Sequence, residues 1–325
     1  TFGIIGLSRV ARKNVLRAIV DSSYAKIGML GTRSPAQARD ALDLYGIPAV
    51  GSYEDVLANP DIDAVYISLP NSLHEEWTVR AAAAGKHVWC EKPAALGYAS
   101  AQRMIAASAK SGMRLMEGFS FLNHPQHAVV RGIIAAGRIG AVARFDGCFS
   151  FPMPPADTTL RDPGLGGGTF FDSAVYPLRA STLFLGLPAT ISCSLLNDSD
   201  GLTVRADMLL TYESGARAHV ASSFGTSFRS HYSLLGESGF IETERAYAVP
   251  PDRAVRVYLE KDDRCTEAVI EPADQFRITV DLFAQELLGR CPAQPHEENL
   301  LLQARIMEAA LCSSKDGRAI SIGDI

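Results

Sequence analysis

The chain has 325 residues, of which 47% are hydrophobic and 21% are charged. This length predicts two domains, because one domain of ordinary size takes up ~150 residues. The formal net charge is −5 and the chain has no run of Lys or Arg, which argues against nucleic-acid binding because phosphate neutralisation needs clustered basic groups. We therefore expect a small-molecule partner and no nucleic acid.

Cysteine usage and hydropathy indicate the compartment. The six cysteines are scattered and none forms a C-x-x-C pair, so we expect neither a zinc site nor a disulfide framework, and a reducing cytoplasm fits best. No uninterrupted apolar stretch is long enough to cross a bilayer, and the N-terminus enters a short β-like run instead of a signal segment. The expected location is the cytoplasm, without a membrane.

The first third of the chain alternates short apolar runs with helical stretches. Strands are expected at residues 2–5, 25–30, 64–68, 87–90 and 114–117, and helices at 10–20, 35–45, 73–84 and 98–111. Repeated βα units imply a parallel sheet with helices on both faces. The sequence therefore predicts an α/β fold that begins with a doubly wound Rossmann domain over residues 1–120.

After about residue 119, strand candidates follow one another without helices between them. They lie at residues 142–150, 190–196, 204–212, 216–224 and 231–235, and helices are expected at 170–184, 274–288 and 297–313. This order predicts an α+β domain over residues 121–325 with a large, mostly antiparallel open sheet. An open sheet with one uncovered face needs a partner, so we expect a homodimer or homotetramer through this sheet.

The segment 3–11, GIIGLSRVA, follows the first expected strand and opens the first expected helix. A dinucleotide-binding fold places its phosphate turn there, where backbone N–H groups and the helix dipole hold a pyrophosphate. Ser8 occupies the second glycine position of the fingerprint and Ala11 the third. The alternative is a plain tight βα turn.

The segment 31–34, GTRS, ends the second expected strand. An NAD enzyme usually has a carboxylate there for the ribose hydroxyls, whereas a hydroxyl and a guanidinium suit the 2′-phosphate of NADP. We therefore expect NADP(H) as the preferred cofactor, with NAD(H) as the alternative. The other interpretation makes Arg33 a solvated loop residue.

Two further segments carry candidate chemistry. VWCEKP, at 88–93, lies at the carboxyl end of an expected strand, where open α/β sheets bind ligands, and Pro93 biases Lys92 toward an extended backbone. In LGGGTFFDSAVYP, at 165–177, Asp172 and Tyr176 are four residues apart and share one helix face. The glycines are expected to leave the start of that helix open to an anionic or hydroxylated ligand. Without further context, these are a charged loop and a surface pair.

These two segments resemble the hallmarks of the glucose-fructose oxidoreductase, inositol dehydrogenase and MocA (Gfo/Idh/MocA) family. Residues 71–74 and 85–88 also resemble that family, and the likeness covers nearly the whole chain. The resemblance implies an NAD(P)-dependent oxidoreductase that transfers a hydride at a hydroxyl or carbonyl carbon of a sugar or sugar-like substrate. Stretches 115–119, 121–127, 149–152 and 274–276 are most similar to nucleotide-linked sugar 3-ketoreductases, and dihydrodiol and xylose dehydrogenases share parts of them.

The resemblance also implies roles for single residues. Negative charge grows on the substrate oxygen as a ketone is reduced, so Lys92 or Tyr176 is expected to donate there, and the sequence does not separate the two. The expected catalytic residues are Lys92, Tyr176 and Asp172. The expected cofactor-binding residues are Gly6, Ser8, Arg9, Val10, Thr32, Arg33, Ser34, Leu69, Pro70, Asn71, His74, Glu91 and Lys92. The expected substrate-binding residues are Phe119, Asn123, His124, Arg161, Asp172 and Tyr176.

Three alternatives stay open at this point. One is a dehydrogenase of a free sugar, polyol or cyclic diol. Another is a non-catalytic NADP(H)-binding sensor or regulatory protein, which Ser8 in the phosphate turn suggests. The third is a metal pair of His124 and His127, but no third ligand follows at a fixed spacing, so we expect no metal site. Tyr66, Trp77 and Phe283 are interpreted as packing residues.

Overall fold

The structure is a computed structural model that describes residues 1–325, apart from the side chain of Gln37. The chain groups into two compact units. The first consists of Thr1–Ser120 and Phe276–Leu301, and the second of Phe121–Gln275 and Leu302–Ile325. The sequence analysis placed residues 276–301 in the second domain, and this differs from the structure. The physical reason is that Val280 and Phe283 are fully buried in the core of the first unit.

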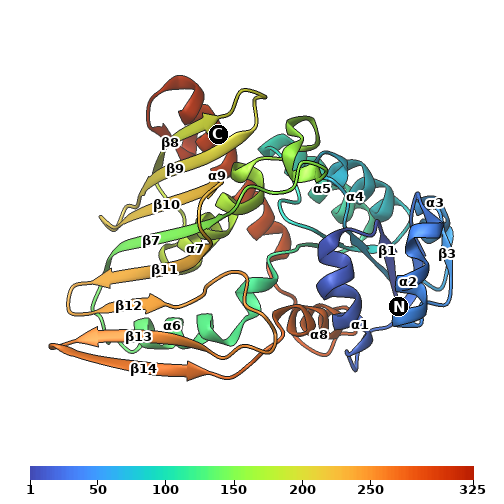
Figure 1. Cartoon of the computed structure of the whole chain (residues 1–325), viewed down its shortest axis with the longest axis horizontal. Helices are drawn as coiled ribbons and strands as arrows, with labels where there is room; N and C mark the ends of the chain where they lie inside the picture. Colours follow the sequence, from blue (N-terminus) through green and yellow to red (C-terminus); the bar gives the residue numbers. More distant parts are fainter. The chain divides into compact units, whose positions relative to one another are not determined.

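The first unit, whose strands β1 and β3 are labelled in Figure 1, contains a six-stranded, all-parallel sheet in the order β3-β2-β1-β4-β5-β6. This strand order confirms the predicted doubly wound fold. Its strands are β1 (Phe2–Ile5), β2 (Ile27–Gly31), β3 (Val50–Gly51), β4 (Ala64–Ile67), β5 (His87–Cys90) and β6 (Leu115–Glu117). β1 and β4 are buried along their whole length, as expected for strands covered on both faces.

The helices of the first unit follow their sequence signals. They are α1 (Leu16–Val20), α2 (Pro35–Tyr45), α3 (Tyr53–Ala58), α4 (His74–Ala83), α5 (Tyr98–Ser111) and α8 (Gln275–Leu287). A π-helical turn, Ala11–Val15, precedes α1. The sequence analysis missed β3 and α3, which are short, although Ser52 and Asp55 form a capping box at the start of α3.

The second unit contains a nine-stranded sheet in the order β14-β13-β12-β11-β7-β10-β9-β8-β15. Its strands are β7 (Val142–Phe151), β8 (Thr190–Asn197), β9 (Thr203–Thr211), β10 (Arg217–Phe224), β11 (Arg229–Gly236), β12 (Phe240–Thr243), β13 (Val255–Lys261), β14 (Arg264–Ile270) and β15 (Ile320–Ser321). β7 and β10 pair parallel, and the other neighbours pair antiparallel. The expected mostly antiparallel sheet is confirmed, although the sequence analysis did not find β12 to β15.

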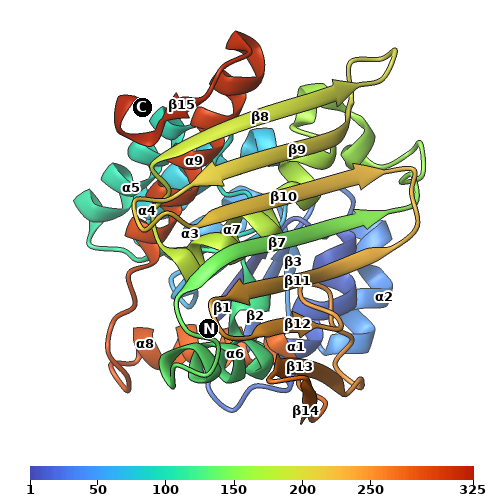
Figure 2. The ribbon, with the colours of Figure 1, turned by 90° about the vertical axis from the view of Figure 1, so that its left-hand side faces the viewer.

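Helices of the second unit cover one face of this sheet. They are α6 (Pro125–Ala135), α7 (Val175–Leu185) and the C-terminal part of α9 (His296–Asp316). α7 packs on β7 and β10, and α6 packs on β13. Figure 2 shows the opposite face of the sheet turned to the viewer, with no helix of this unit in front of it. One face of the second unit is therefore open.

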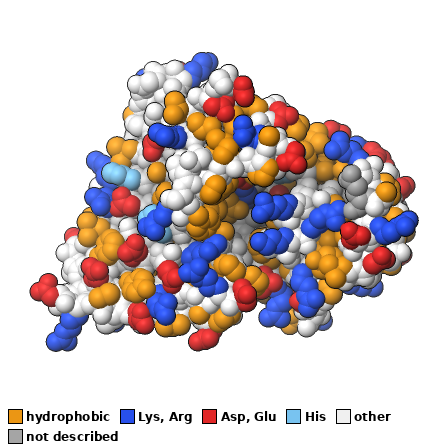
Figure 3. All heavy atoms as spheres, viewed as in Figure 1, with side chains coloured by type: hydrophobic (Ala, Val, Ile, Leu, Met, Phe, Trp, Pro, Cys, Tyr) orange, Lys and Arg blue, Asp and Glu red, His pale blue; other side chains and the backbone are white. Residues whose placement is uncertain are grey.

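Two surface properties complete the description. Among the helices that the structure describes, none is long and apolar enough to cross a membrane. Basic and acidic side chains are interspersed over the face of the molecule seen in Figure 3, in keeping with the net charge of −5.

Candidate active site

Four parallel strands of the first unit end in one row. Ile5 of β1 pairs with Gly31 of β2 and with Ile67 of β4, and Ile67 pairs with Cys90 of β5. The chain therefore leaves the sheet at the same level in all four places, and the turns that follow lie side by side. Most of the expected cofactor-binding residues come directly after these four strand ends, at the edge where open parallel sheets bind ligands.

The phosphate turn after β1 depends on Gly6. This residue has a φ of +87°, and a Cβ atom here would lie 2.8 Å from the carbonyl oxygen of Ser68. Only glycine tolerates both conditions. The turn therefore packs closely against the end of β4. Arg9 and Val10, which follow, are exposed.

Ser8 caps the helix that starts in this turn. Its Oγ accepts a hydrogen bond from Ala11 N at 3.1 Å and another from Ser68 Oγ. A serine hydroxyl has two lone pairs and one hydrogen, so these contacts use the lone pairs and leave the hydrogen for a further acceptor. Serine at the second glycine position of the dinucleotide-binding motif thus makes two side-chain hydrogen bonds that glycine cannot make.

The turn after β2 contains Thr32, Arg33 and Ser34. Ser34 N donates to Thr32 Oγ1 at 3.1 Å, and Thr32 N donates to Gly51 O at 2.9 Å. Arg33 is exposed at the same edge of the sheet as the phosphate turn. No carboxylate lies in the segment 31–34.

The turn after β4 is joined to the lysine turn by His74. Its Nδ1 lies 2.8 Å from Pro93 O and its Nε2 lies 2.9 Å from Leu69 O. The ring is fully buried, and burial, reinforced by the charge of Lys92, lowers its pKa to about 4. The ring therefore joins the two turns through two backbone oxygens, and its expected contact with the cofactor stays a prediction. Leu69, Pro70 and Asn71 are partly exposed.

Each residue of the turn at 91–94 makes a hydrogen bond that holds the turn in place. Glu91 Oε1 accepts from Tyr66 Oη at 2.8 Å, and Lys92 N donates to Glu91 Oε2 at 3.3 Å. Pro93 O contacts His74, and Ala94 N donates to Glu117 Oε1 at 2.9 Å. The Lys92–Pro93 peptide bond is cis. The backbone that carries the Lys92 side chain is therefore fixed from β4, α4 and β6, while the side chain itself is partly exposed.

In the second unit, the glycine-rich segment closes on the chain before it. The amides of Gly167 and Gly168 donate to Asp162 O and Leu160 O, each at 2.9 Å. A Cβ atom on Gly167 would lie 2.6 Å from Leu160 O, and Gly168 has a φ of +96°. These glycines bring the backbone onto the turn that carries Arg161, and two of their amides are used there. The expectation that the helix start is open to a ligand concerns the amides that follow Gly168, and it stays a prediction.

Asp172 and Tyr176 come from two kinds of helical turn. The sequence predicts one helix over 170–184, whereas the structure has a π-helical turn, Phe170–Ala174, followed by α7. Both side chains are partly exposed. Such π-turns are frequent at functional sites, and the other one, Ala11–Val15, follows the phosphate turn.

A hydroxyl triad, which the sequence analysis missed, holds this π-turn on the sheet. Thr169 Oγ1 lies 2.8 Å from Ser173 Oγ and 2.6 Å from Ser222 Oγ, and the two serine oxygens are 2.6 Å apart. Ser222 Oγ also donates to Phe149 O at 2.8 Å. All three hydroxyls are buried. The triad links the π-turn to β10 and β7.

Aromatic rings surround Tyr176. Its ring centroid lies 5.1 Å from Phe149, 5.6 Å from Phe121 and 5.9 Å from Tyr247. These neighbours restrict the ring to a narrow range of orientations. The phenol is thus presented from a rigid aromatic cluster.

The other expected substrate-binding residues are spread over both units. Phe119 is buried in the first unit. Asn123 and Arg161 of the second unit are partly exposed. His124 is buried at the start of α6, where its Nδ1 accepts from Gln126 N at 3.3 Å, and burial lowers its pKa to about 4.

His127, next to His124 on α6, is a core residue. Its Nδ1 lies 2.8 Å from Tyr232 Oη, and burial lowers its pKa to about 3. Among the residues that the structure describes, no three His, Cys, Asp or Glu side chains gather as a metal site would require.

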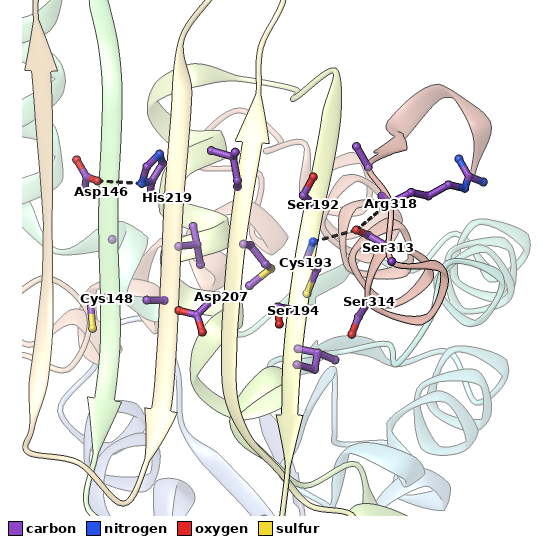
Figure 4. A pocket seen from close by; sticks show the side chains of 18 of the residues that line it. Asp146, Cys148, Ser192, Cys193, Ser194, Asp207, His219, Ser313, Ser314 and Arg318 are labelled. Atoms are coloured by element: carbon purple, nitrogen blue, oxygen red, sulfur yellow. Dashed lines mark hydrogen bonds and ion pairs between the residues drawn. The ribbon is translucent and has the colours of Figure 1, made fainter.

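A hollow of about 850 Å³ lies on the open face of the nine-stranded sheet (Figure 4). Asp146 and His219 lie together on its floor at 3.7 Å, and Ser313 links Cys193 N to Arg318 O at its rim. Asp146 and Phe149 of β7 point to opposite faces because side chains alternate along a strand. Tyr176 contacts Phe149, so this outer hollow and Tyr176 lie on opposite faces of the sheet.

Comparisons with known proteins match both units. Residues 1–119 match the family described as an oxidoreductase family with an NAD-binding Rossmann fold, and residues 127–242 match the GFO/IDH/MocA C-terminal domain. The chain is 34% identical over 325 residues to a D-xylose 1-dehydrogenase (NADP(+)) of Haloferax volcanii, covering 99% of each protein. It is 31% identical to a dTDP-3,4-didehydro-2,6-dideoxy-alpha-D-glucose 3-reductase of Actinomadura kijaniata, covering 97% of this chain and 95% of that protein.

A solved structure gives a similar result. The 3-ketoreductase from Actinomadura kijaniata, crystallised with NADP and TDP-benzene, superposes with a TM-score of 0.92 at 31% identity. The match covers 96% of this chain and 97% of that one.

Proposed function

The chain belongs to the Gfo/Idh/MocA oxidoreductase family, and we propose that it transfers a hydride between a nicotinamide cofactor and a carbonyl or hydroxyl carbon of a sugar or sugar-like substrate. The observation that carries this proposal is the row of strand ends. It sets the phosphate turn, the Arg33 turn and the anchored Lys92 turn at one edge of a parallel sheet. That edge is where such folds bind dinucleotides.

Lys92 is the proposed catalytic donor. The cofactor supplies or accepts the hydride, and negative charge develops on the substrate oxygen during reduction. An ammonium on a fixed backbone stabilises that charge without reorganisation at the moment of reaction. Tyr176 is the second candidate for the proton transfer, and the aromatic cluster supports it because the phenol is held in place. Asp172 is proposed to bind substrate hydroxyls or to tune Lys92.

NADP(H) is the proposed preferred cofactor, with NAD(H) as the alternative. Thr32, Arg33 and Ser34 offer hydroxyls and a guanidinium where an NAD enzyme has a carboxylate. Both the xylose dehydrogenase and the 3-ketoreductase are NADP proteins by their descriptions.

A nucleotide-linked 3-keto sugar and a free sugar are the two proposed substrate classes. The similarity to the dTDP-sugar 3-reductase supports the first. The similarity to the D-xylose dehydrogenase supports the second. Initial rates with NADPH and dTDP-linked keto sugars, and with NADP and free aldoses, separate the two.

Replacing Lys92 by methionine tests the catalytic proposal. Lys92→Met keeps the length of the side chain and removes the ammonium, so we expect kcat to fall by about 10²- to 10⁴-fold with little change in the Kd for NADPH. Lys110→Met removes an exposed lysine of α5 and serves as the matched control. Near-normal turnover of Lys92→Met contradicts the role. A wild-type protein that binds NADPH but turns over no sugar favours the sensor alternative.

Oligomeric state and compartment are also proposals. The open sheet face exposes Leu209, which pairs with His219, and Leu235, which pairs with Arg144. Asp146 lies beside them and pairs with His219. Such a mixed face supports a homodimer or homotetramer through this sheet, and the molar mass in solution tests it. All six cysteines are free thiols, which supports a reducing cytoplasm.

A further inference from the structure

Tyr66 lies beneath the lysine turn, at the end of β4. Its side chain is fully buried among β1, β4 and β5, with its ring 4.8 Å from that of Trp89 on the paired position of β5. Packing explains a ring in this place but not its hydroxyl, because phenylalanine would fill the same volume without a buried polar atom. The hydroxyl needs a separate reason.

The Tyr66 hydroxyl donates a hydrogen bond to the side chain of Glu91. Tyr66 Oη donates to Glu91 Oε1 at 2.8 Å, and the other oxygen of the same carboxylate accepts the amide of Lys92 at 3.3 Å. Glu91 N donates in turn to Ile67 O at 3.0 Å, so the residue is tied to β4 through both its backbone and its side chain. The carboxylate is buried as well. One tyrosine on β4 therefore fixes the acidic residue that fixes the backbone of Lys92.

We propose that Tyr66 is a positioning residue for the lysine turn, which holds Glu91 in the orientation that presents Lys92 to the substrate. This inference rests on the proposed function of Lys92. The phenol is a donor at every pH at which the protein is folded, because burial and the Glu91 charge raise its pKa well above the ordinary value of 10.0. A donor to a carboxylate stabilises the charged form of that carboxylate.

Other ionisable groups also face the lysine turn. Cys90 precedes Glu91, Glu117 of β6 accepts Ala94 N, and His74 of α4 contacts Pro93 O. Burial raises the pKa of Cys90 well above its usual value and lowers that of His74 to about 4. Cys90 and His74 therefore keep their charge between pH 5 and 8, and Glu91 and Glu117 are the carboxylates that contact the turn.

The test is Tyr66→Phe, which removes the hydroxyl alone. We expect kcat at neutral pH to fall about tenfold with an unchanged KM for the cofactor, because supporting partners of a functional group typically contribute this much. We also expect the acid limb of the kcat–pH profile to move upward by about one pH unit, because a buried carboxylate that loses a donor binds a proton more readily. A purely structural role of Tyr66 would lower stability without moving this limb.

Two further variants make the result decisive. Glu91→Gln keeps the shape but cannot titrate, so the acid limb should disappear, and adding Tyr66→Phe to it should produce no further shift. Tyr45→Phe removes another tyrosine hydrogen bond of the first unit, from Tyr45 Oη to Arg12 O at 2.8 Å, and should leave kcat and its pH profile unchanged. Thermal unfolding shows that each variant is folded at the assay temperature. If Tyr66→Phe is not folded there, all profiles are measured at a lower temperature at which it is folded.

The outcomes separate this inference from the proposed function. If Lys92→Met is inactive while Tyr66→Phe and Glu91→Gln keep the wild-type kcat and pH profile, the role of Tyr66 is refuted and that of Lys92 stands. If Lys92→Met keeps normal activity, the proposed function of Lys92 itself fails. A shifted limb in Tyr66→Phe that is absent in the Glu91→Gln background supports the inference.

Discussion

At the scale of single residues, Arg33 gives the sharpest test of cofactor choice. Its side chain is exposed at the end of β2, so it can meet a 2′-phosphate without any rearrangement of the core. We expect Arg33→Gln to lower kcat/KM for NADPH by about 10- to 100-fold, because a charge-assisted contact with phosphate is lost, and to leave kcat/KM for NADH nearly unchanged. Steady-state kinetics with both cofactors measure this.

The matched control for this variant is Arg39→Gln, which removes an exposed arginine from α2. Equal losses with NADPH and NADH in Arg33→Gln would show that the guanidinium does not recognise the 2′-phosphate. A wild-type preference for NADH would contradict the cofactor assignment itself.

The sequence predicts positions that follow a strand end and misses contacts between side chains of two strands. Lys92 and Arg33 could be placed at one edge of the sheet because each follows an expected strand, and those strands end in register; their roles stay predictions. Tyr66 was assigned to packing, which its burial confirms, but its bond to Glu91 joins residues 25 positions apart. A hydrogen bond between residues so far apart in the sequence leaves no local sequence pattern that would predict it. His74 was expected at the cofactor, whereas its two nitrogens contact backbone oxygens of two different turns.

At the scale of elements, long periodic segments were predicted closely and short or late ones were not. β5, α2 and α5 have the predicted bounds, because a buried apolar run or an amphipathic stretch with clear flanks defines each. β3 has two residues and α3 has six, too few for a period to show. β13 was missed although Val255, Val257 and Leu259 are buried in strict alternation. The alternation of apolar and polar residues that predicts a strand was therefore present in the sequence at β13.

The hydroxyl triad offers a prediction at this scale. Ser222→Ala removes one buried hydroxyl from the contact between the π-turn and β10, leaving Thr169 and Ser173 with fewer partners. We expect the free energy of unfolding to fall by about 1–3 kcal/mol and kcat to fall as well, because Asp172 lies in this turn. Urea denaturation and steady-state kinetics measure the two effects.

Ser223→Ala is the control on the neighbouring position of β10. Its hydroxyl is only partly buried and contacts Thr226 Oγ1 at 2.9 Å, so we expect a change within about 0.5 kcal/mol. Similar stabilities of Ser222→Ala and Ser223→Ala would show that the triad does not hold the π-turn.

At the scale of the whole molecule, the return of residues 276–301 to the first unit could not be predicted. It depends on side chains from distant parts of the chain. Arg114, which precedes β6, pairs with both Glu286 and Glu297, and Ser22 Oγ donates to Asp281 Oδ1 at 2.5 Å. Each of these residues alone resembles an ordinary surface charge or hydroxyl. Only their meeting in the folded chain assigns the segment to the first unit.

Each compact unit contains a fully buried histidine, and this makes the stability of the whole molecule depend on pH. Burial lowers the pKa of His74 in the first unit to about 4 and that of His127 in the second to about 3, below the ordinary value of about 6.5. The unfolded chain therefore binds these protons first. The stabilisation is complete above pH 6.5 and is lost as the pH falls toward 4, by about 1.4 kcal/mol per pH unit for each histidine.

We expect the calorimetric unfolding temperatures to decline steadily from pH 6.5 to pH 5, a range in which ordinary carboxylates remain ionised. His127→Gln should reduce this decline, because glutamine has no proton to gain, and His124, whose pKa burial lowers to about 4, accounts for a part that remains. His219→Gln should not reduce it, because the His219 side chain is 56% exposed. Transitions that stay constant between pH 7 and pH 5 would contradict the argument.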